Sequence, residues 1–283
     1  MKMKNSLLAI ALGLLVAAAP LQGQRKVLAV GNVKINPSVE TAAKAEGTLL
    51  PLQRVTEAID GQLIDALNGT RKFEIIARSD LDSLLEEGGF TGEGLQVGGS
   101  DYLVVPAVDD FQDIVETFSA NGRQATKRTI RLGMVARIYD SQSGKLLESA
   151  NFQFDNREAK NILGSVQRKG EYSAALLRQI AEEMAEKCAT RVVDVIYPAR
   201  IIAVTGPQAT INRGDGTGIE SGQLWNAYAL GEELIDPDTG ESLGRTEVKV
   251  GTIRIDRVTP KFSTGTITEN FGVSKGAVVR KTQ

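Results

Sequence analysis

Neighbouring carboxylates are the first candidates for chemistry in this sequence. Asp109 and Asp110 are adjacent, and Asp113 and Glu116 follow shortly after them. Two carboxyl groups can act as general acid and general base when their environments separate their pKa values. Nothing nearby in the sequence supplies a matched partner or an electrophile, and acidic runs usually form solvated faces. We therefore expect these residues to end a strand and enter a loop, without a catalytic role.

A second acidic motif, DPDTGE, covers Asp236–Glu241. Alternating acidic oxygens before a glycine resemble half of a calcium-binding loop. The distal glutamate that completes such a loop is missing, and the flanking segments have the pattern of strands rather than helices. Asp and Pro followed by Gly are typical of a tight turn, because proline presets the backbone at its second position. The motif therefore predicts a turn between two strands.

Two glycine-rich stretches could hold a phosphate group, namely Gly88–Gly99 and the GDGTG run at Gly214–Gly218. Neither has the spacing of a Walker A loop or of the dinucleotide fingerprint. No helix is expected to begin after Gly218, so no helix N-terminus would face a phosphate there. We expect a loop at the first stretch and a flexible connection between strands at the second.

The composition excludes several mechanisms. The chain has no histidine and one cysteine, Cys188, so an imidazole base, a His-ligated zinc and a cysteine metal cage are all excluded. Cys188 falls on the apolar stripe of an expected helix, which predicts a buried thiol. The sequence thus predicts no catalytic residue, no cofactor-binding residue and no metal ligand, and a protein that is not an enzyme.

The first segment, Met1–Gly23, has the pattern of a secretory signal peptide. Lys2 and Lys4 precede an uncharged run over Leu7–Ala19, which ends at Pro20. A membrane span needs about 20 apolar residues, and this run is shorter. No cysteine lies near the end of the segment, so we expect no lipid anchor. The pattern predicts an exported protein of the periplasm.

The charge balance argues against a nucleic-acid partner. Loss of Lys2 and Lys4 would leave 31 basic against 35 acidic residues, a formal net charge of −4 instead of −2. A nucleic-acid-binding protein is expected to show a basic stripe. The cluster of Arg123, Lys127, Arg128 and Arg131 is instead expected to form the solvated face of a strand.

Hydrophobic periodicity predicts a mixed α/β layer, with helices on a sheet, over residues 24–197. Its clearest strand alternates apolar residues from Ile130 to Ile138 and returns over Leu146–Phe154 after a turn at Asp140–Gly144. Further strands are expected at Lys26–Ile35, Phe73–Ala77 and Tyr102–Val108; a polar loop is expected after the first of these. Helices are expected from Leu52 to Leu67, with a left-handed stop at Asn68-Gly69, from Ser79, and over Glu171–Ile196.

Tyr197-Pro198-Ala199 breaks the last helix and predicts a domain boundary. From Arg200 onward only strand patterns occur, so residues 198–283 predict a small all-β barrel or sandwich. Within Glu247–Val258 the apolar phase changes from Val248 and Val250 to Ile253 and Ile255, which predicts a β-bulge at Gly251. The predicted fold class is therefore α+β.

Several of these segments together resemble the CsgG family of curli-assembly proteins. The resemblance spans Lys26 to Ile196 and is carried by Gly61–Leu67, Phe73–Glu87, Ser100–Val105 and Val135–Leu147. The amino-terminal domain of TolB and penicillin-binding-protein activators of the LpoB type are similar in layout. The C-terminal part is similar to the carboxyl-terminal domain of FlgT, a flagellar assembly protein. There the carrying segments are Thr210–Gly214, Gly222–Trp225, Asp236–Gly244 and Val250–Ile255.

The resemblance implies a non-enzymatic protein of envelope assembly or secretion that acts through protein–protein contacts. Its implied partners are envelope or secretion-machinery proteins, while peripheral association with the outer membrane and homo-oligomerisation remain open. One alternative is an outer-membrane secretion pore subunit. The two candidate hairpins for a pore, Asp109–Arg137 and Asn151–Val166, lack the apolar alternation that membrane strands need. The other alternative is an exported hydrolase using Asp109, Asp110 and Asp236.

Overall fold

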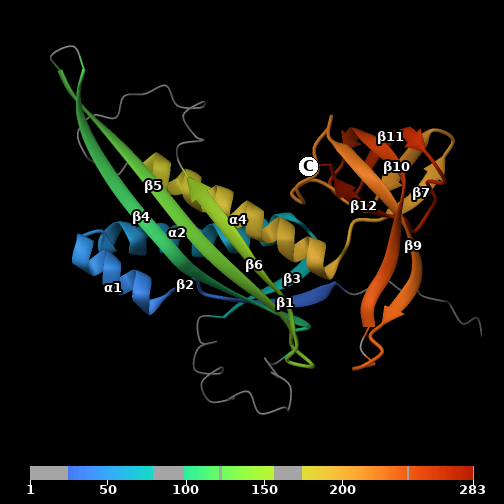
Figure 1. The fold of residues 1–283 in the computed structure, drawn as a ribbon, viewed down its shortest axis with the longest axis horizontal. Helices are drawn as coiled ribbons and strands as arrows, with labels where there is room; N and C mark the ends of the chain where they lie inside the picture. Colours follow the sequence, from blue (N-terminus) through green and yellow to red (C-terminus); the bar gives the residue numbers. More distant parts are fainter. Residues whose placement is uncertain (1–24, 79–98, 121–122, 156–173, 241, 283) are drawn as a thin grey trace, which may run out of the picture.

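The computed structural model describes residues 25–78, 99–120, 123–155, 174–240 and 242–282 (Figure 1). Its helices are α1 (Pro37–Glu46), α2 (Leu49–Gly69) and α4 (Ala174–Ile196). Its strands are β1 (Lys26–Gly31), β2 (Lys34–Ile35), β3 (Phe73–Arg78), β4 (Tyr102–Ala120), β5 (Arg123–Asp140), β6 (Leu146–Asp155), β7 (Ile201–Thr205), β8 (Gln208–Ile211), β9 (Leu224–Ile235), β10 (Ser242–Val258), β11 (Ser263–Asn270) and β12 (Val278–Lys281). The strands form two sheets, which confirms the predicted α+β class.

The N-terminal sheet has the order β3-β1-β4-β5-β6, and β2 adds to β4. Strands β3, β1 and β4 are parallel, whereas β4, β5 and β6 form antiparallel hairpins. The predicted alternation is confirmed: every second residue of β5 from Ile130 to Ile138 is buried. The predicted apolar face of α2, which includes Leu52, Ile59 and Leu67, is buried with it. Together with α4 these residues form one core on one face of the sheet.

Helix α1 lies where the sequence predicted a polar loop, so that prediction is wrong. The side chain of Asn36 accepts a hydrogen bond from the Ser38 amide, Pro37 occupies the first turn, and Gly47 ends the helix at φ 71°. Only Val39 and Ala43 of this helix are buried. Two buried residues leave too short an apolar stripe for periodicity to detect, and the capping residues were the only signal.

The stop of α2 also differs from the prediction. Gly69 is still helical, and the left-handed residue is Arg71, with φ 56°. A side chain at this backbone angle costs about 1–2 kcal/mol relative to the right-handed region. The chain therefore turns from α2 into β3 two residues later than the glycine suggested.

Strand β4 is much longer than Tyr102–Val108. It continues to Ala120, so Asp109, Asp110 and Asp113 lie within a strand and do not enter a loop. The register between β4 and β5 shifts between Val108 and Asp110. This bulge moves the apolar phase of β4 by one residue, which is why the alternation after Val108 was hidden in the sequence.

The C-terminal sheet has the order β12-β9-β10-β11-β8-β7 and its own core. Arg200, just before β7, forms a single bridge to Val278 of β12, but the described strands do not close into a barrel. The predicted bulge is confirmed, because the β9–β10 register shifts between Lys249 and Gly251. Val248, which the pattern placed in the core, is instead 63% exposed.

Each sheet extends into a two-stranded arm. Among the described residues, 113–120 of β4 pair only with 123–130 of β5, beyond Asp155 at the end of β6. Residues 229–235 of β9 pair only with residues 242–248 of β10, beyond β12 and β11. In Figure 1 the first arm extends past the helices at the upper left, and the second extends below the C-terminal sheet. We call them the β4–β5 arm and the β9–β10 arm.

Some predicted elements lie outside the described residues. These are the segment Met1–Gly23, the helix beginning at Ser79, the glycine-rich stretch before Gly99, and the second candidate hairpin beyond Asp155. Within the described part of the chain, no helix has both the length and the hydrophobicity needed to cross a membrane.

Candidate functional site

The acidic residues named by the sequence do not come together. Asp109 and Asp110 lie at the bulge of β4, where Gly133 on β5 leaves room for the Asp109 carboxylate. Asp236 lies in the other sheet, in the turn between β9 and β10. Since no described geometry joins the two positions, they do not form the acid–base pair of the hydrolase alternative.

Within the DPDTGE motif, the residues Asp236–Gly240 form the predicted turn. Oδ1 of Asp236 accepts hydrogen bonds from the amides of Asp238, at 2.8 Å, and Thr239, at 3.0 Å. These amide bonds lower the pKa of Asp236. Gly240 has φ 71°, which favours glycine. The carboxylate thus stabilises the turn, and the described residues contain no group of three or more side chains suited to a metal ion.

Cys188 is fully buried on α4, as predicted. Burial raises the pKa of its thiol to about 12. A thiol in this state is not a nucleophile near neutral pH, because the reactive form is the thiolate. The Cys188 side chain therefore packs in the hydrophobic core of the N-terminal part.

The structure reveals instead a polar junction between the two sheets. Its central contact joins Arg213, which follows β8, to Asp194 on α4, with Nη2 2.5 Å from Oδ1. The Arg213 side chain is fully buried, and its Nε and Nη1 have no partner among the described residues. Burial lowers the pKa of Arg213 and raises that of Asp194, although their mutual attraction opposes both shifts.

Lys72 adds a second cation to this junction. Its Nζ donates a hydrogen bond of 2.8 Å to the backbone carbonyl of Asn212, across 140 residues of sequence. Burial, together with the nearby Arg213, lowers the pKa of Lys72. The turn from α2 into β3 is thereby attached to the loop that follows β8.

The GDGTG run has a different role from the flexible connection predicted for it. A Cβ at Gly216 would lie 3.1 Å from the Gly69 carbonyl oxygen, and one at Gly218 would lie 2.8 Å from Cγ2 of Thr190. Both glycines have positive φ, at 74° and 75°. They let the loop approach the end of α2 and the side of α4 closely, so the run is a docking loop.

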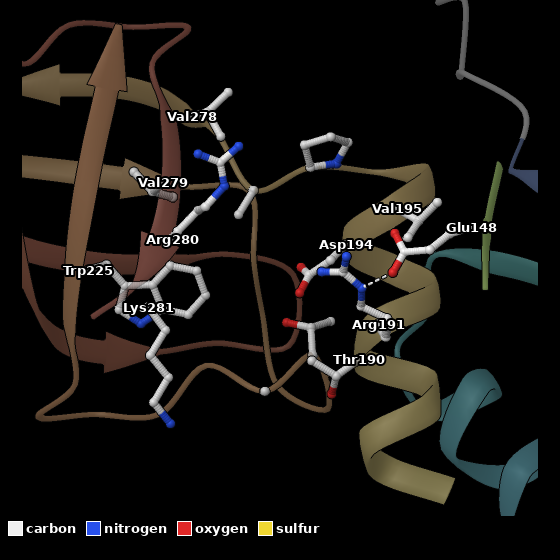
Figure 2. Close-up of a pocket in the computed structure, with 14 residues that line it drawn as sticks. Glu148, Thr190, Arg191, Asp194, Val195, Trp225, Val278, Val279, Arg280 and Lys281 are labelled. Carbon is white, nitrogen blue, oxygen red and sulfur yellow. Dashed lines mark hydrogen bonds and ion pairs between the residues drawn. The ribbon is translucent and has the colours of Figure 1, made fainter. Parts of the chain in front are cut away.

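Two clefts flank this docking loop. The first, of about 450 Å³, lies between α4 and the strands β9 and β12 (Figure 2). Figure 2 shows Arg191 and Asp194 on one wall and Arg280 on the other, with Arg191 paired to Glu148 at 2.6 Å. The second cleft, also about 450 Å³, lies between α2, α4 and the loop and is lined by Asp65, Glu182, Glu186, Asp215 and Glu220. Thr190 and Gly218 line both clefts.

Sequence reasoning missed this junction. Arg213 lies in the segment Thr210–Gly214 that resembles FlgT, and Asp194 lies in the predicted helix Glu171–Ile196 outside its apolar stripe. The available signal was Arg213 beside the GDGTG segment, because alternating glycines can mark a point where two backbones approach each other closely. The polar junction can orient the two sheets, and its two clefts can bind ligands or partners.

Neither a protein-family model nor a curated protein matches this chain. Among solved structures, it is similar to the PelC dodecamer from Paraburkholderia phytofirmans at 11% identity and a TM-score of 0.32, covering 61% of this chain and 87% of that one. It is similar to hypothetical protein CT253 from Chlamydia trachomatis at 10% identity and a TM-score of 0.37, covering 61% and 96%. It is also similar to lipoprotein GNA1162 from Neisseria meningitidis at 13% identity and a TM-score of 0.29, covering 58% of this chain and 98% of that one. Similarity at this level assigns neither a family nor a function.

Proposed function

We propose that this protein is a non-enzymatic assembly protein of the cell envelope, resembling CsgG in its N-terminal part, and that it acts through protein–protein contacts. The observation that carries the proposal is the pair of two-stranded arms, which extend beyond both sheets. Edge strands with unpaired backbone groups are templates for partner binding. The signal-peptide pattern of Met1–Gly23 supports export to the periplasm.

The β9–β10 arm has the better-defined binding surface. Four apolar side chains on it are substantially exposed, namely Leu234, Ile235, Leu243 and Val248. Exposed apolar side chains gathered on one short segment are typical of interaction sites. Charged side chains lie among them, including an ion pair between Glu247 and Arg280 at the base of the arm. A partner that binds here would bury apolar side chains within a polar rim.

The test is a capture experiment from envelope extract with the tagged mature chain. Leu243→Asp should remove the co-purifying proteins that the unchanged chain captures, because it places a charge in the buried part of the contact. Phe271→Asp is the matched control, since Phe271 is 74% exposed and lies off the arm, directly after β11 of the same sheet. Equal capture by both variants would show that the arm is not the binding surface.

The two alternatives have distinct signatures. A chain that stays in outer membranes after a carbonate wash and conducts ions in bilayers would be a pore subunit instead. A hydrolytic activity abolished by Asp109→Asn, Asp110→Asn or Asp236→Asn would point to the carboxylate enzyme. The assembly proposal expects release by carbonate and no such dependence.

A further inference from the structure

The two sheets are built on separate cores with almost no chain between them. Tyr197 packs against the core of the N-terminal sheet, and Ala199 belongs to the core of the C-terminal sheet. Pro198 alone separates these two residues. Because neither core extends across Pro198, apolar packing does not join the two halves at this point.

Among the described residues, the two halves also meet along a polar strip. It comprises the Arg213–Asp194 ion pair, the hydrogen bond from Lys72 to Asn212, and the close approaches of Gly216 and Gly218 to Gly69 and Thr190. Relative motion is the default for two units of one chain unless their interface is large and hydrophobic. The described contacts of this strip are an ion pair, a hydrogen bond and close approaches at two glycines, and none of them joins large apolar side chains.

The strip also contains an unsatisfied group. Arg213 is sealed from solvent, yet Nε and Nη1 have no hydrogen-bond partner among the described residues. A buried donor without a partner loses the hydration that it would have in water. Opening the strip would return that hydration, and the Arg213–Asp194 pair opposes the opening. Within the strip, the Arg213–Asp194 pair thus acts against the cost of burying its own guanidinium, while the Lys72–Asn212 hydrogen bond carries no such cost at Arg213.

Space for such a motion exists on both sides of the strip. Thr190 and Gly218 line both clefts of about 450 Å³, so the contact between these two residues separates one cleft from the other. Rotation about Pro198 would widen one cleft and narrow the other.

We propose that Tyr197-Pro198-Ala199 is a hinge and that the Arg213–Asp194 pair closes it, so that the protein exchanges between this closed form and an open form with a solvated Arg213. The hinge would set the relative direction of the β4–β5 and β9–β10 arms. It goes beyond the proposed function, because the motion does not depend on which partner the arms bind.

The first test measures a distance across the hinge by electron spin resonance. Spin labels are attached to Arg54→Cys on α2 and Lys275→Cys after β11, both exposed positions, while the native Cys188 is fully buried and stays unlabelled. The unchanged hinge should give two distance populations. Asp194→Asn should raise the ratio of open to closed chains about tenfold, because it leaves the buried guanidinium without its carboxylate.

Glu183→Gln is the matched control for charge and helix. Glu183 lies on α4 and pairs with Lys187 at 2.6 Å on the surface, so its loss should leave both populations unchanged. A single narrow distance that Asp194→Asn does not alter would overturn the proposal. Circular dichroism verifies that each variant is folded.

A cross-link provides a second test that does not require Asp194→Asn to fold. A Cβ at Gly218 would lie 3.6 Å from Cβ of Thr190, within the range of about 3.5–4.5 Å that disulfides adopt. The oxidised chain with Thr190→Cys and Gly218→Cys should show a smaller radius of gyration by X-ray scattering than the unchanged chain. The unchanged chain is the reference because a side chain at Gly218, where φ is 75°, strains the reduced variant. Identical scattering curves for the oxidised variant and the unchanged chain would overturn the hinge.

Discussion

The two sheets of this protein are stabilised in different ways. The N-terminal sheet buries large aliphatic side chains from α2 and α4 on one face, in a continuous core. The C-terminal sheet has no helix in its described part and a smaller core, and its strands approach one another closely at glycines such as Gly251 and Gly265. The comparison shows that the first sheet depends on side-chain volume, whereas the second depends on the absence of side chains at particular points.

The largest effect is expected from truncating a side chain in the N-terminal core. Ile59→Ala on α2 should lower the free energy of unfolding by about 2–5 kcal/mol, because Ile59 is fully buried and a cavity would remain. Urea unfolding followed by far-UV circular dichroism measures this, since all three described helices belong to the N-terminal part. Ile202→Ala, at a largely exposed position on β7, is the control and should change stability by less than about 0.5 kcal/mol. Equal losses in both variants would contradict the role given to side-chain volume.

The next effect tests the C-terminal sheet by adding one carbon atom. A Cβ at Gly251 would lie 2.2 Å from the Glu269 carbonyl oxygen, so the backbone must move. Gly251→Ala should cost about 1–3 kcal/mol. Trp225 is the only tryptophan and is buried in this sheet, so its fluorescence reports the unfolding of this half. An unchanged free energy of unfolding in Gly251→Ala would refute the argument that the Glu269 backbone leaves no room for a side chain at this position.

A smaller, pH-dependent effect is expected at Asp101, which joins β1 to the start of β4. Its carboxylate accepts a hydrogen bond of 2.8 Å from the Val27 amide and pairs with Lys26. The amide bond, followed by Lys26, lowers the pKa of Asp101. Its stabilisation is therefore present above the unfolded pKa of about 3.9 and is lost as the pH falls through the lower folded value.

Asp101→Asn should accordingly lose about 1 kcal/mol near neutral pH and approach the unchanged protein at low pH. Thermal unfolding over a pH series measures the convergence. Asp65→Asn, at an exposed position on α2, should show no such trend. A constant difference across the series would mean that Asp101 acts through packing rather than charge.

The smallest effect has the opposite sign. Gly61 lies inside α2 with nothing within 4 Å of the position that a Cβ would occupy. Gly61→Ala should stabilise the N-terminal half by about 0.5–1 kcal/mol, because glycine loses more backbone freedom in a helix than alanine. Replacing glycine by alanine is therefore expected to raise the free energy of unfolding at Gly61, in the N-terminal half, and to lower it at Gly251, in the C-terminal half. Destabilisation at both positions would remove that distinction.

The elements that sequence reasoning found are those with a regular apolar period. The face of α2 around Ile59, the alternation of β5 and the C-terminal strand at Glu247–Val258 were predicted near their observed places. The errors fall where the period is interrupted or too short. Helix α1 has only two buried residues, and β4 changes phase at the bulge beside Asp109.

The polar junction could not be predicted from the sequence, whereas two local features were predicted correctly. They are the buried thiol of Cys188 and the turn at Asp236. Arg213 and Asp194 are 19 residues apart in sequence, and Lys72 is 140 residues from Asn212. No local pattern relates residues at such separations, because their contact depends on how two independently built sheets meet.

The amino-acid sequence by itself determined the α+β class, the hydrophobic faces and the turn at DPDTGE, since each follows from the period or the backbone preference of a short segment. Only the tertiary structure decided that the GDGTG run docks against α2 and α4, that β4 and β5 extend into an arm, and that Arg213 is sealed at the junction. Burial and pairing of a charge depend on distant groups. For that reason the composition could exclude mechanisms but could not locate the polar strip between the two sheets.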